Sequence, residues 1–363
     1  MTERSKNGAS GEALNSPAGD VNGDGDGLAL EVCHLFFDDQ CSKKEIGERL
    51  SISRFRVARL IEQALASGQV RIEYRDRDLI DRDLSRRLAQ TYNLRLCMAV
   101  NAAGRSDEDV RGSVGSAAAS VVSELVHPGD VVGLGWGRSL SAVVECLPQS
   151  AHSEVDVVQL AGGSARTAFG LDPTELARRF ALRLGGRLHV IHAPAFVQSK
   201  EVRDALLCEQ DISGALALFD RLSLAVLGVG ALVGQGAQIP ASSLSISGVL
   251  PRQELEQVLA AGALGELMLH PFDAEGRFIA DPTSDRRVAV SIDQLRRTSR
   301  VVAVASGVDK APAIQGALRS GVVTMLITDD AAARWLVDNA PLGAPRGALQ
   351  LANLMPIAGP VDE

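Results

Sequence analysis

Residues 41–60 read CSKKEIGERLSISRFRVARL, a stretch whose spacing predicts two short helices joined by a tight turn. Ser42 stands three residues before Glu45, which is the spacing of a capping box at a helix start. Ile46 and Leu50 are four residues apart and therefore give this helix one apolar face. The stretch thus predicts a first helix that begins near Ser42 and ends before residue 51.

A second helix is predicted to begin after Ser53, because a serine hydroxyl is a common helix N-cap. Its apolar residues recur at helical spacing, at Val57, Leu60 and Ile61. Its first two turns carry three arginines and no acidic residue: Arg54, Arg56 and Arg59. Two short helices with the second one basic at its N-terminal end are typical of a helix-turn-helix with its recognition helix.

The residues expected to contact DNA are the basic side chains of both helices and two neighbours: Lys43, Lys44, Ser53, Arg54, Phe55, Arg56 and Arg59. Lysines and arginines contact phosphates or base edges, while Ser53 and Phe55 shape the local fit. Which arginine reads bases stays open at this point, and Arg59, two turns into the helix, could instead lie along the protein surface. A protein-interaction module is the alternative for these helices, and the run of arginines argues against it.

Charge limits how well one copy of this module can bind DNA. The chain has a net charge of −8, so binding must come from a local positive patch. Residues 28–75 hold eight Lys and Arg against seven Asp and Glu, a net charge of +1. Useful affinity therefore predicts several copies held together, because linked sites gain effective concentration.

The composition of the 363 residues is typical of an α/β protein. It is 46% hydrophobic and 4% aromatic with 35 glycines, which suits buried parallel strands. The five cysteines are dispersed without a C-x-x-C pair, as in proteins with reduced thiols. Neither a signal peptide nor a membrane span is expected, because no segment is apolar enough. We therefore expect a cytoplasmic protein that does not bind membranes.

The chain is predicted to divide into five parts: a disordered tail over 1–26, a winged-helix-like helix-turn-helix domain over 27–75, a linker helix over 76–93, a large α/β domain over 94–340, and a C-terminal tail over 341–363. Within the second part, an additional helix is expected at about 28–37, and QVRIEY at 69–74 alternates like a short wing strand.

From Leu94 onward, short apolar runs alternate with amphipathic helices. The predicted strands are LRLCMAV, DVVGLGW, VDVVQLAGG, LHVIHAPA, LSLAVLGVG, VVAVASG and VVTMLIT. This alternation indicates a Rossmann-like parallel sheet with ligand-binding loops at the carboxyl ends of its strands.

The glycine-rich turn GLGWGRSL over 133–140 is the strongest candidate for ligand binding. It follows a predicted strand and opens a helix, where close backbone approach and free N–H groups favour a phosphate. Arg138 adds a positive charge and Ser139 a hydroxyl. The turn lacks G-x-G-x-x-G and P-loop spacing, so we expect no nucleotide cofactor. A purely structural strand-to-helix turn is the alternative.

Three other strand ends carry glycine-bearing polar loops, at 159–164, 228–230 and 307–310. Lys310 is the best second cation for an anionic ligand, with a solvated surface lysine as the alternative. No metal site is expected, because His189 and His192 lie three apart on a predicted strand and point to opposite faces.

Together these motifs resemble the SorC-type family of sugar-responsive bacterial transcription regulators. The resemblance runs from about Leu28 to Val337 and is carried by SRFRVARL, GLGWGRSL, VVQLAGG, APAFV, LAVLGVG, GALGELMLHPFDAEGRF and SGVDKAPAIQGALRSGVVTMLITDDAAARWL. It implies that residues 94–340 form a sugar-phosphate-binding effector and oligomerisation domain, which is related in fold to phosphosugar isomerases but acts as a sensor, with a homotetramer on operator DNA. The function it implies is regulation of a carbohydrate or polyol catabolic operon, controlled by a phosphorylated sugar effector.

The resemblance also implies the residues of the effector site. It places the effector's phosphate at Gly135, Trp136, Gly137, Arg138 and Ser139, with Lys310 opposite. It places the sugar against Gln159, Gly162, Gly163 and Glu266. The family commonly has Asp at the position of Glu266 and a polar residue at that of Ala161, and these departures leave the identity of the effector open.

A sugar-phosphate isomerase with an added N-terminal module is the alternative function, because such a pocket also suits an isomerase. The loops contain no convincing pair of catalytic base and acid, which favours the regulator.

Overall fold

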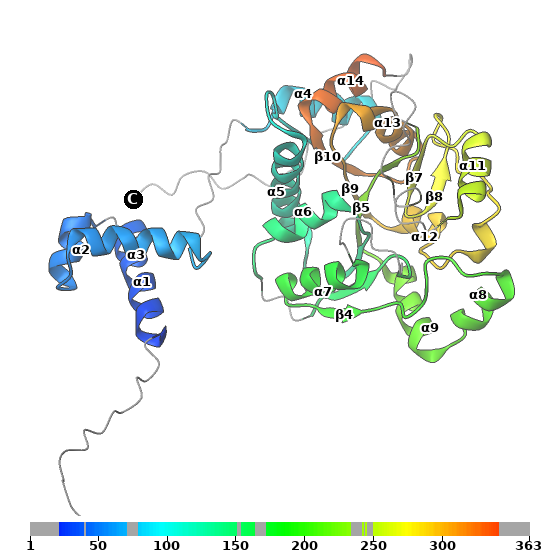
Figure 1. The fold of residues 1–363 in the computed structure, drawn as a ribbon. Coiled ribbons are helices and arrows are strands. Elements are labelled where there is room, and N and C mark those ends of the chain that lie inside the picture. The colour runs from blue at the N-terminus through cyan, green and yellow to red at the C-terminus, as the bar shows by residue number, and fades with distance from the viewer. Residues whose placement is uncertain are drawn as a thin grey trace, which may run out of the picture. The chain divides into compact units, whose positions relative to one another are not determined.

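The computed structural model describes residues 22–39, 41–70, 79–150, 154–163, 172–233, 242, 244 and 250–340. The chain forms two compact units, which divide between Asp76 and Arg77 (Figure 1). The predicted C-terminal tail, most of the predicted tail at 1–26 and most of the predicted wing strand lie outside the described residues.

The first unit contains three helices: α1 (Asn22–Phe37), α2 (Lys43–Arg49) and α3 (Arg54–Ala66). Val32, Ile46 and Val57, one from each helix, are fully buried in a common core. The predicted helices are therefore confirmed. The prediction of disorder up to residue 26 is wrong for its last residues, because α1 extends into a polar first turn that carries no apolar signal.

The second unit is built on a parallel sheet of seven strands: β1 (Leu96–Val100), β2 (Val131–Leu134), β3 (Asp156–Gln159), β4 (Arg187–His189), β5 (Leu224–Gly228), β9 (Arg300–Val304) and β10 (Met325–Asp329). The strand order is β1-β10-β9-β5-β2-β3-β4. The carboxyl ends of all seven strands lie at one edge, as the predicted wound α/β fold requires. The fold class is confirmed.

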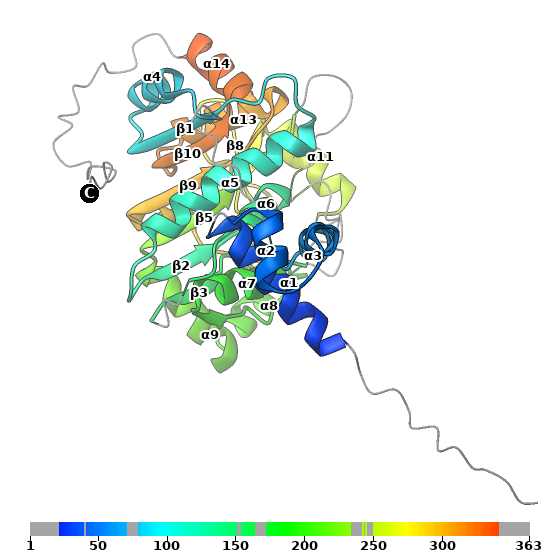
Figure 2. The same cartoon turned by 90° about the vertical axis from the view of Figure 1, so that its left-hand side faces the viewer.

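Two layers of helices cover this sheet (Figure 2). The helices of one core are α5 (Asp107–Leu125), α6 (Arg138–Cys146) and α7 (Pro173–Leu184). The helices of the other core are α4 (Arg82–Tyr92), α9 (Gln210–Ala217), α11 (Arg252–Ala260), α12 (Ile292–Arg297), α13 (Ala311–Arg319) and α14 (Asp330–Asp338). Neighbouring strand residues alternate between the cores, as Val132 and Val131 do, because strand side chains point to opposite faces in turn.

The smaller elements of the second unit are α8 (Lys200–Leu207), the 3₁₀ turns η3 (Leu218–Arg221), η4 (Ser284–Arg286) and η5 (Val308–Lys310), and the strands β6 (Gly230–Ala231), β7 (Gly265–Leu267) and β8 (His270–Phe272). These three strands form an antiparallel sheet of their own. The sequence analysis does not predict it, because strands of two or three residues are too short for a period-2 pattern.

Two further predictions need correction. The linker helix predicted over 76–93 is α4, whose Leu84 and Leu88 are buried in a core of the second unit, so it is part of that unit. Because most of its residues are charged or polar, the sequence alone does not show that this helix packs on the second unit. Of the strand predicted at LHVIHAPA, only Leu188 and His189 belong to β4, which is an edge strand with one neighbour.

Within the described residues, none of the helices has the length and apolar character needed to cross a membrane.

Candidate DNA-binding and effector sites

The helix starts of the first unit are fixed by serine caps. Ser42 accepts a hydrogen bond from the Glu45 N–H at 3.3 Å, and the Glu45 carboxylate accepts one from the Ser42 N–H at 2.8 Å. This is the predicted capping box, and it holds the pKa of Glu45 below its usual value. Ser53 caps α3 by accepting from the Arg56 N–H at 3.2 Å.

The turn between α2 and α3 is tight because a glycine allows close approach. The Ile52 N–H donates to the Gly47 carbonyl at 2.9 Å, and a Cβ at Gly47 would lie 2.7 Å from the Ile52 oxygen. Ser51 adopts a left-handed φ of 55°, which reverses the chain before Ser53. The sequence analysis does not identify Gly47, although glycine in a helix before a turn is a usable signal.

The predicted DNA contacts at the start of α3 are exposed side chains. Arg54, Phe55, Arg56 and Arg59 are all exposed, and the Phe55 ring is 73% exposed. The guanidinium carbon of Arg54 lies 4.9 Å from the centroid of the Phe55 ring. Lys43 and Lys44 belong to α2, where the Lys43 amine lies 5.6 Å from the Phe36 ring centroid.

In the second unit, the predicted glycine-rich turn joins β2 to α6. The Gly135 N–H donates to the Val226 carbonyl at 3.0 Å, so the turn is fixed to β5. Gly137 is the N-cap of α6 with a φ of 136°, a conformation that favours glycine. Because Gly137 offers no side-chain cap, the first N–H groups of α6 can bind an anion. Arg138 and Ser139 are the first residues of this helix, and both are half-buried.

Arg138 and Lys310 both have lowered pKa values, and Arg111 contributes to each shift. Burial lowers the pKa of Arg138, and Arg111 of α5 lowers it further, while Asp107 opposes the shift. Burial also lowers the pKa of Lys310, to about 8, with a further lowering by Arg138 and Arg111 and an opposing effect of Glu266. We call Arg111, Arg138 and Lys310 the cation cluster. The sequence analysis misses Arg111, because it lies in a helix rather than in a loop after a strand.

A carboxylate at the end of β10 fixes the loop that leads to Lys310. Asp329 is 2% exposed and accepts from the Gly307 N–H at 2.6 Å and from the Ala332 N–H at 3.0 Å. It thus connects the start of α14 with the loop that leads into η5 and Lys310. Lys310 is half-buried, and its contact with an anionic ligand stays a prediction.

Glu266 supports a strained turn in the smaller sheet. Met268 and Leu269 join β7 to β8 with φ values of 46° and 70°, which are unfavourable for residues other than glycine. The Glu266 carboxylate is 3% exposed and accepts from the Leu269 N–H at 2.8 Å. A Cβ at Gly135 would lie 2.8 Å from the Met268 sulfur, so this turn contacts the glycine-rich turn. Such strain is often found at functional sites.

The other residues predicted to contact the sugar have hydrogen-bond partners within the protein. The Gln159 side chain is 2% exposed, accepts from the Ile191 N–H at 3.0 Å and donates to Thr174 at 3.3 Å. The Gly162 and Gly163 N–H groups donate to the Val288 and Ala193 carbonyls at 2.9 and 2.8 Å. These residues therefore have structural partners, and their contact with a sugar stays a prediction.

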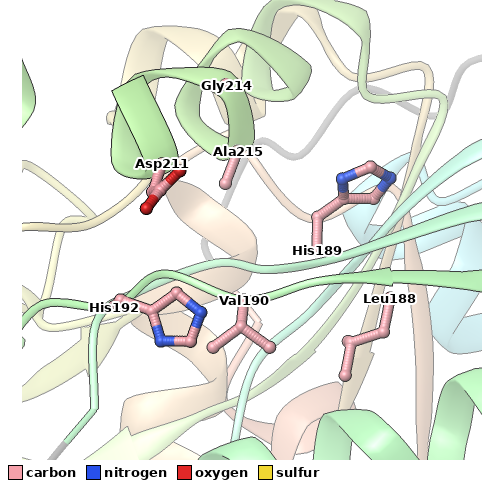
Figure 3. A pocket seen from close by; sticks show the side chains of 7 residues that line it. All are labelled: Leu188, His189, Val190, His192, Asp211, Gly214 and Ala215. Atoms are coloured by element: carbon pink, nitrogen blue, oxygen red, sulfur yellow. The ribbon is translucent and has the colours of Figure 1, made fainter. Parts of the chain in front are cut away.

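A separate cavity of about 330 Å³ lies at the β4 edge of the sheet (Figure 3). It is lined by Leu188, His189, Val190, His192, Asp211, Gly214 and Ala215. No residue predicted to bind the effector lines it. His189 is hydrogen-bonded to Asp156 at 2.8 Å, and the described residues contain no cluster of three or more metal-ligating side chains.

Comparison with known proteins identifies the family of the second unit. Residues 79–338 match the family model described as "Putative sugar-binding domain". The chain is 30% identical over 325 residues to the erythritol catabolism regulatory protein EryD of Brucella abortus, a match that covers 89% of this chain and 98% of that protein. The matched residues include α4, which agrees with its packing in the second unit.

Two solved structures have the same fold. The full-length sorbitol operon regulator SorC of Klebsiella pneumoniae matches with a TM-score of 0.70 at 23% identity, covering 85% of this chain and 98% of that chain. A domain described as that of a "possible sugar-binding transcriptional regulator" from Arthrobacter aurescens matches with a TM-score of 0.63 at 29% identity, covering 70% of this chain and 96% of that domain. EryD and SorC are both named as regulators, so the isomerase alternative is not supported. The chain belongs to the SorC-type family of sugar-binding transcriptional regulators.

Proposed function

We propose that this regulator binds the operator of a carbohydrate or polyol catabolic operon through α2 and α3, and that a phosphorylated sugar or polyol controls this binding. The observation that supports the effector class is the cation cluster beside the uncapped start of α6. A phosphate ester is a small anion that several cations and the N–H groups of a helix start can bind together. EryD is named for erythritol catabolism, so phosphorylated polyols are the first candidates.

In this proposal the phosphate binds Gly135, Trp136, Gly137, Arg138 and Ser139, with Lys310 and Arg111 completing its charge partners. The sugar or polyol part lies toward Glu266, Gln159, Gly162 and Gly163. The Glu266 carboxylate can accept hydrogen bonds from hydroxyl groups of the effector. The Met268 side chain lies against Gly135 of the glycine-rich turn.

The effector proposal is tested by a thermal-shift screen of tetritols, pentoses and hexitols, each with and without phosphate. A ligand that binds the folded chain raises Tm, since it adds to the free energy of unfolding. We expect shifts only from phosphorylated compounds, and we expect Arg138→Ala and Lys310→Ala to reduce them. Full shifts in both variants would overturn the phosphate site, and shifts from unphosphorylated compounds alone would overturn the effector class.

The DNA proposal rests on the exposed arginines of α3. We expect Arg54→Ala combined with Arg56→Ala to weaken operator binding and to reduce its salt dependence, because each phosphate contact releases counterions. The measurement is a mobility-shift titration at several salt concentrations. Unchanged affinity and salt slope would contradict the assignment of α3.

We further propose that the chain acts as a homo-oligomer, a dimer or a tetramer. The support is the small net charge of the helix-turn-helix segment, which gives one copy few electrostatic contacts. Sedimentation of the full chain with and without operator DNA measures this directly, and a monomer bound tightly to a single site would contradict it.

A further inference from the structure

The helix α3 separates its side chains into a buried side and an opposite exposed side. Its buried residues are Val57, Leu60, Ile61 and Ala64. At about 100° per residue, Phe55 and Arg59 lie on the side opposite to these residues and are one helical turn apart. Arg54 and Arg56 lie on the two flanks between the buried and the exposed side. The four exposed residues therefore occupy three different directions around the helix.

The exposure of Phe55 has no explanation in the folding of the first unit. Its ring is 73% exposed, the largest value among the exposed large hydrophobic residues that the structure describes. Apolar surface in water is unfavourable, so a ring in this position suggests contact with a partner. The Arg54 guanidinium 4.9 Å from its centroid covers part of the ring and limits its rotation.

The surroundings of Phe55 select nucleic acid as its partner. Three arginines lie within four residues of it, and no acidic residue occurs between Ser53 and Ile61. An apolar protein partner would have to bury these charges without neutralising them, which is costly. A DNA groove supplies both phosphates for the arginines and an apolar group for the ring, because thymine presents its 5-methyl group in the major groove.

We infer that Phe55 and Arg59 are the base-reading pair of this regulator and that Arg54 and Arg56 contact the phosphates on either side. Phe55 contacts the methyl group of a thymine, and Arg59 binds the O6 and N7 atoms of a guanine. Four residues of helix rise about 6 Å, so the two bases lie about two base pairs apart. The inference rests on the proposed operator binding by α3 and adds which residues carry its sequence specificity.

The test uses the full chain and a duplex that it selects from a random library. Each thymine of this duplex is replaced in turn by deoxyuridine, which removes only the 5-methyl group. For the native chain we expect one replacement to weaken binding about fourfold, the effect of one buried methyl group. The Phe55→Ala variant should bind the original duplex and the duplex with this deoxyuridine replacement equally weakly.

Two further variants separate the roles of the side chains. Leu65→Ala removes another exposed apolar side chain of α3, away from the Phe55 and Arg59 direction, and should keep the thymine preference. Arg59→Ala should relax the preference for guanine about two base pairs from the sensitive thymine. Arg54→Ala should weaken all duplexes alike and reduce the salt slope by about one.

The outcomes distinguish this inference from the function on which it rests. If the chain selects no duplex, or if binding does not depend on Arg54 and Arg56, the proposed operator binding by α3 is wrong. If binding depends on these arginines but no uridine replacement matters, or if Phe55→Ala keeps the difference, only the base-reading assignment is overturned. Phe55 is exposed, so its replacement should leave the unfolding temperature of the chain unchanged, and circular dichroism checks this.

Discussion

Lys310 connects the proposed effector site with pH. In the free protein its pKa is lowered to about 8, chiefly by burial and then by Arg138. A bound phosphate favours the protonated amine, so binding above pH 8 must take up a proton. We therefore expect effector affinity to fall as pH rises above about 8. Titration calorimetry at pH 7, 8 and 9 measures this, and Lys310→Arg should remove the dependence because arginine keeps its charge.

The lowered pKa of Lys310 has the opposite effect on the stability of the fold, which it increases as pH rises. The amine has an ordinary pKa of 10.5 in the unfolded chain, which therefore holds more protons than the folded chain between about pH 8 and 10.5. The contribution of Lys310 to the free energy of unfolding accordingly rises with pH in this window. An effector affinity that rose together with stability would contradict the assignment of Lys310 to the phosphate.

Glu266 offers a second test at the residue scale. Its carboxylate satisfies the buried N–H of Leu269 in a turn with two left-handed residues. Glu266→Ala leaves this donor unpaired and should lower the free energy of unfolding by about 1–3 kcal/mol. Glu266→Gln keeps an acceptor oxygen, so its free energy of unfolding should fall by less. Chemical denaturation of both variants measures this difference. Equal losses would mean that the hydrogen bond to Leu269 is not what Glu266 contributes.

Glu266→Gln also tests the electrostatics of the site. The carboxylate of Glu266 raises the pKa of Lys310, against the lowering by burial and the arginines. Its neutralisation should therefore move the fall in effector affinity to a lower pH. A pH profile of affinity that is identical in the variant would contradict a coupling between these two side chains.

At the scale of elements, the packing of α5 on α6 brings Arg111 and Arg138 to one place. A Cβ at Gly115 would lie 2.6 Å from the Cβ of Ala142 and 2.8 Å from its carbonyl carbon, so the helices meet at a glycine. Gly115→Ala should force them apart, with a loss of about 1–3 kcal/mol and weaker effector binding.

Gly112→Ala is the matched control on the same helix. No atom outside the neighbouring helix backbone lies within 4 Å of a Cβ at this position. Alanine is favoured over glycine inside a helix, so this variant should gain about 0.5–1 kcal/mol and keep its effector affinity. Thermal unfolding and calorimetry of the pair check the prediction, and a destabilised Gly112→Ala or an unaffected Gly115→Ala would contradict it.

The elements also show what can be predicted from sequence and why. Helices such as α3 and strands such as β5 carry periodic apolar patterns or long apolar runs, and the structure confirms them. The sheet of β6, β7 and β8 is missed, because its strands have two or three residues and its turn uses Met268 and Leu269 where glycine or asparagine is usual. Arg111 is missed because only tertiary packing brings α5 beside the glycine-rich turn. The site residues themselves stay predictions.

At the scale of the whole molecule, regulation requires a coupling between the two units. If the effector changes operator affinity by some factor, the operator must change effector affinity by the same factor, because the two binding equilibria form a closed cycle. For a family of regulators we expect a factor of about 5–150. The effector is titrated into the free chain and into the chain saturated with operator, and operator affinity is measured with and without effector.

Two variants tell coupling apart from loss of binding. Arg138→Ala should weaken the effector in both titrations and leave operator affinity of the free chain unchanged, since Arg138 belongs to the second unit. Arg56→Ala should weaken the operator and leave effector affinity of the free chain unchanged, since Arg56 belongs to the first. In each variant, the ratio between effector affinity with operator bound and effector affinity without operator should equal that of the native chain, provided that the operator is saturating. A ratio of one in the native chain would mean that the compound occupies the second unit without controlling DNA binding, and the effector assignment would then be wrong even if the compound bound tightly.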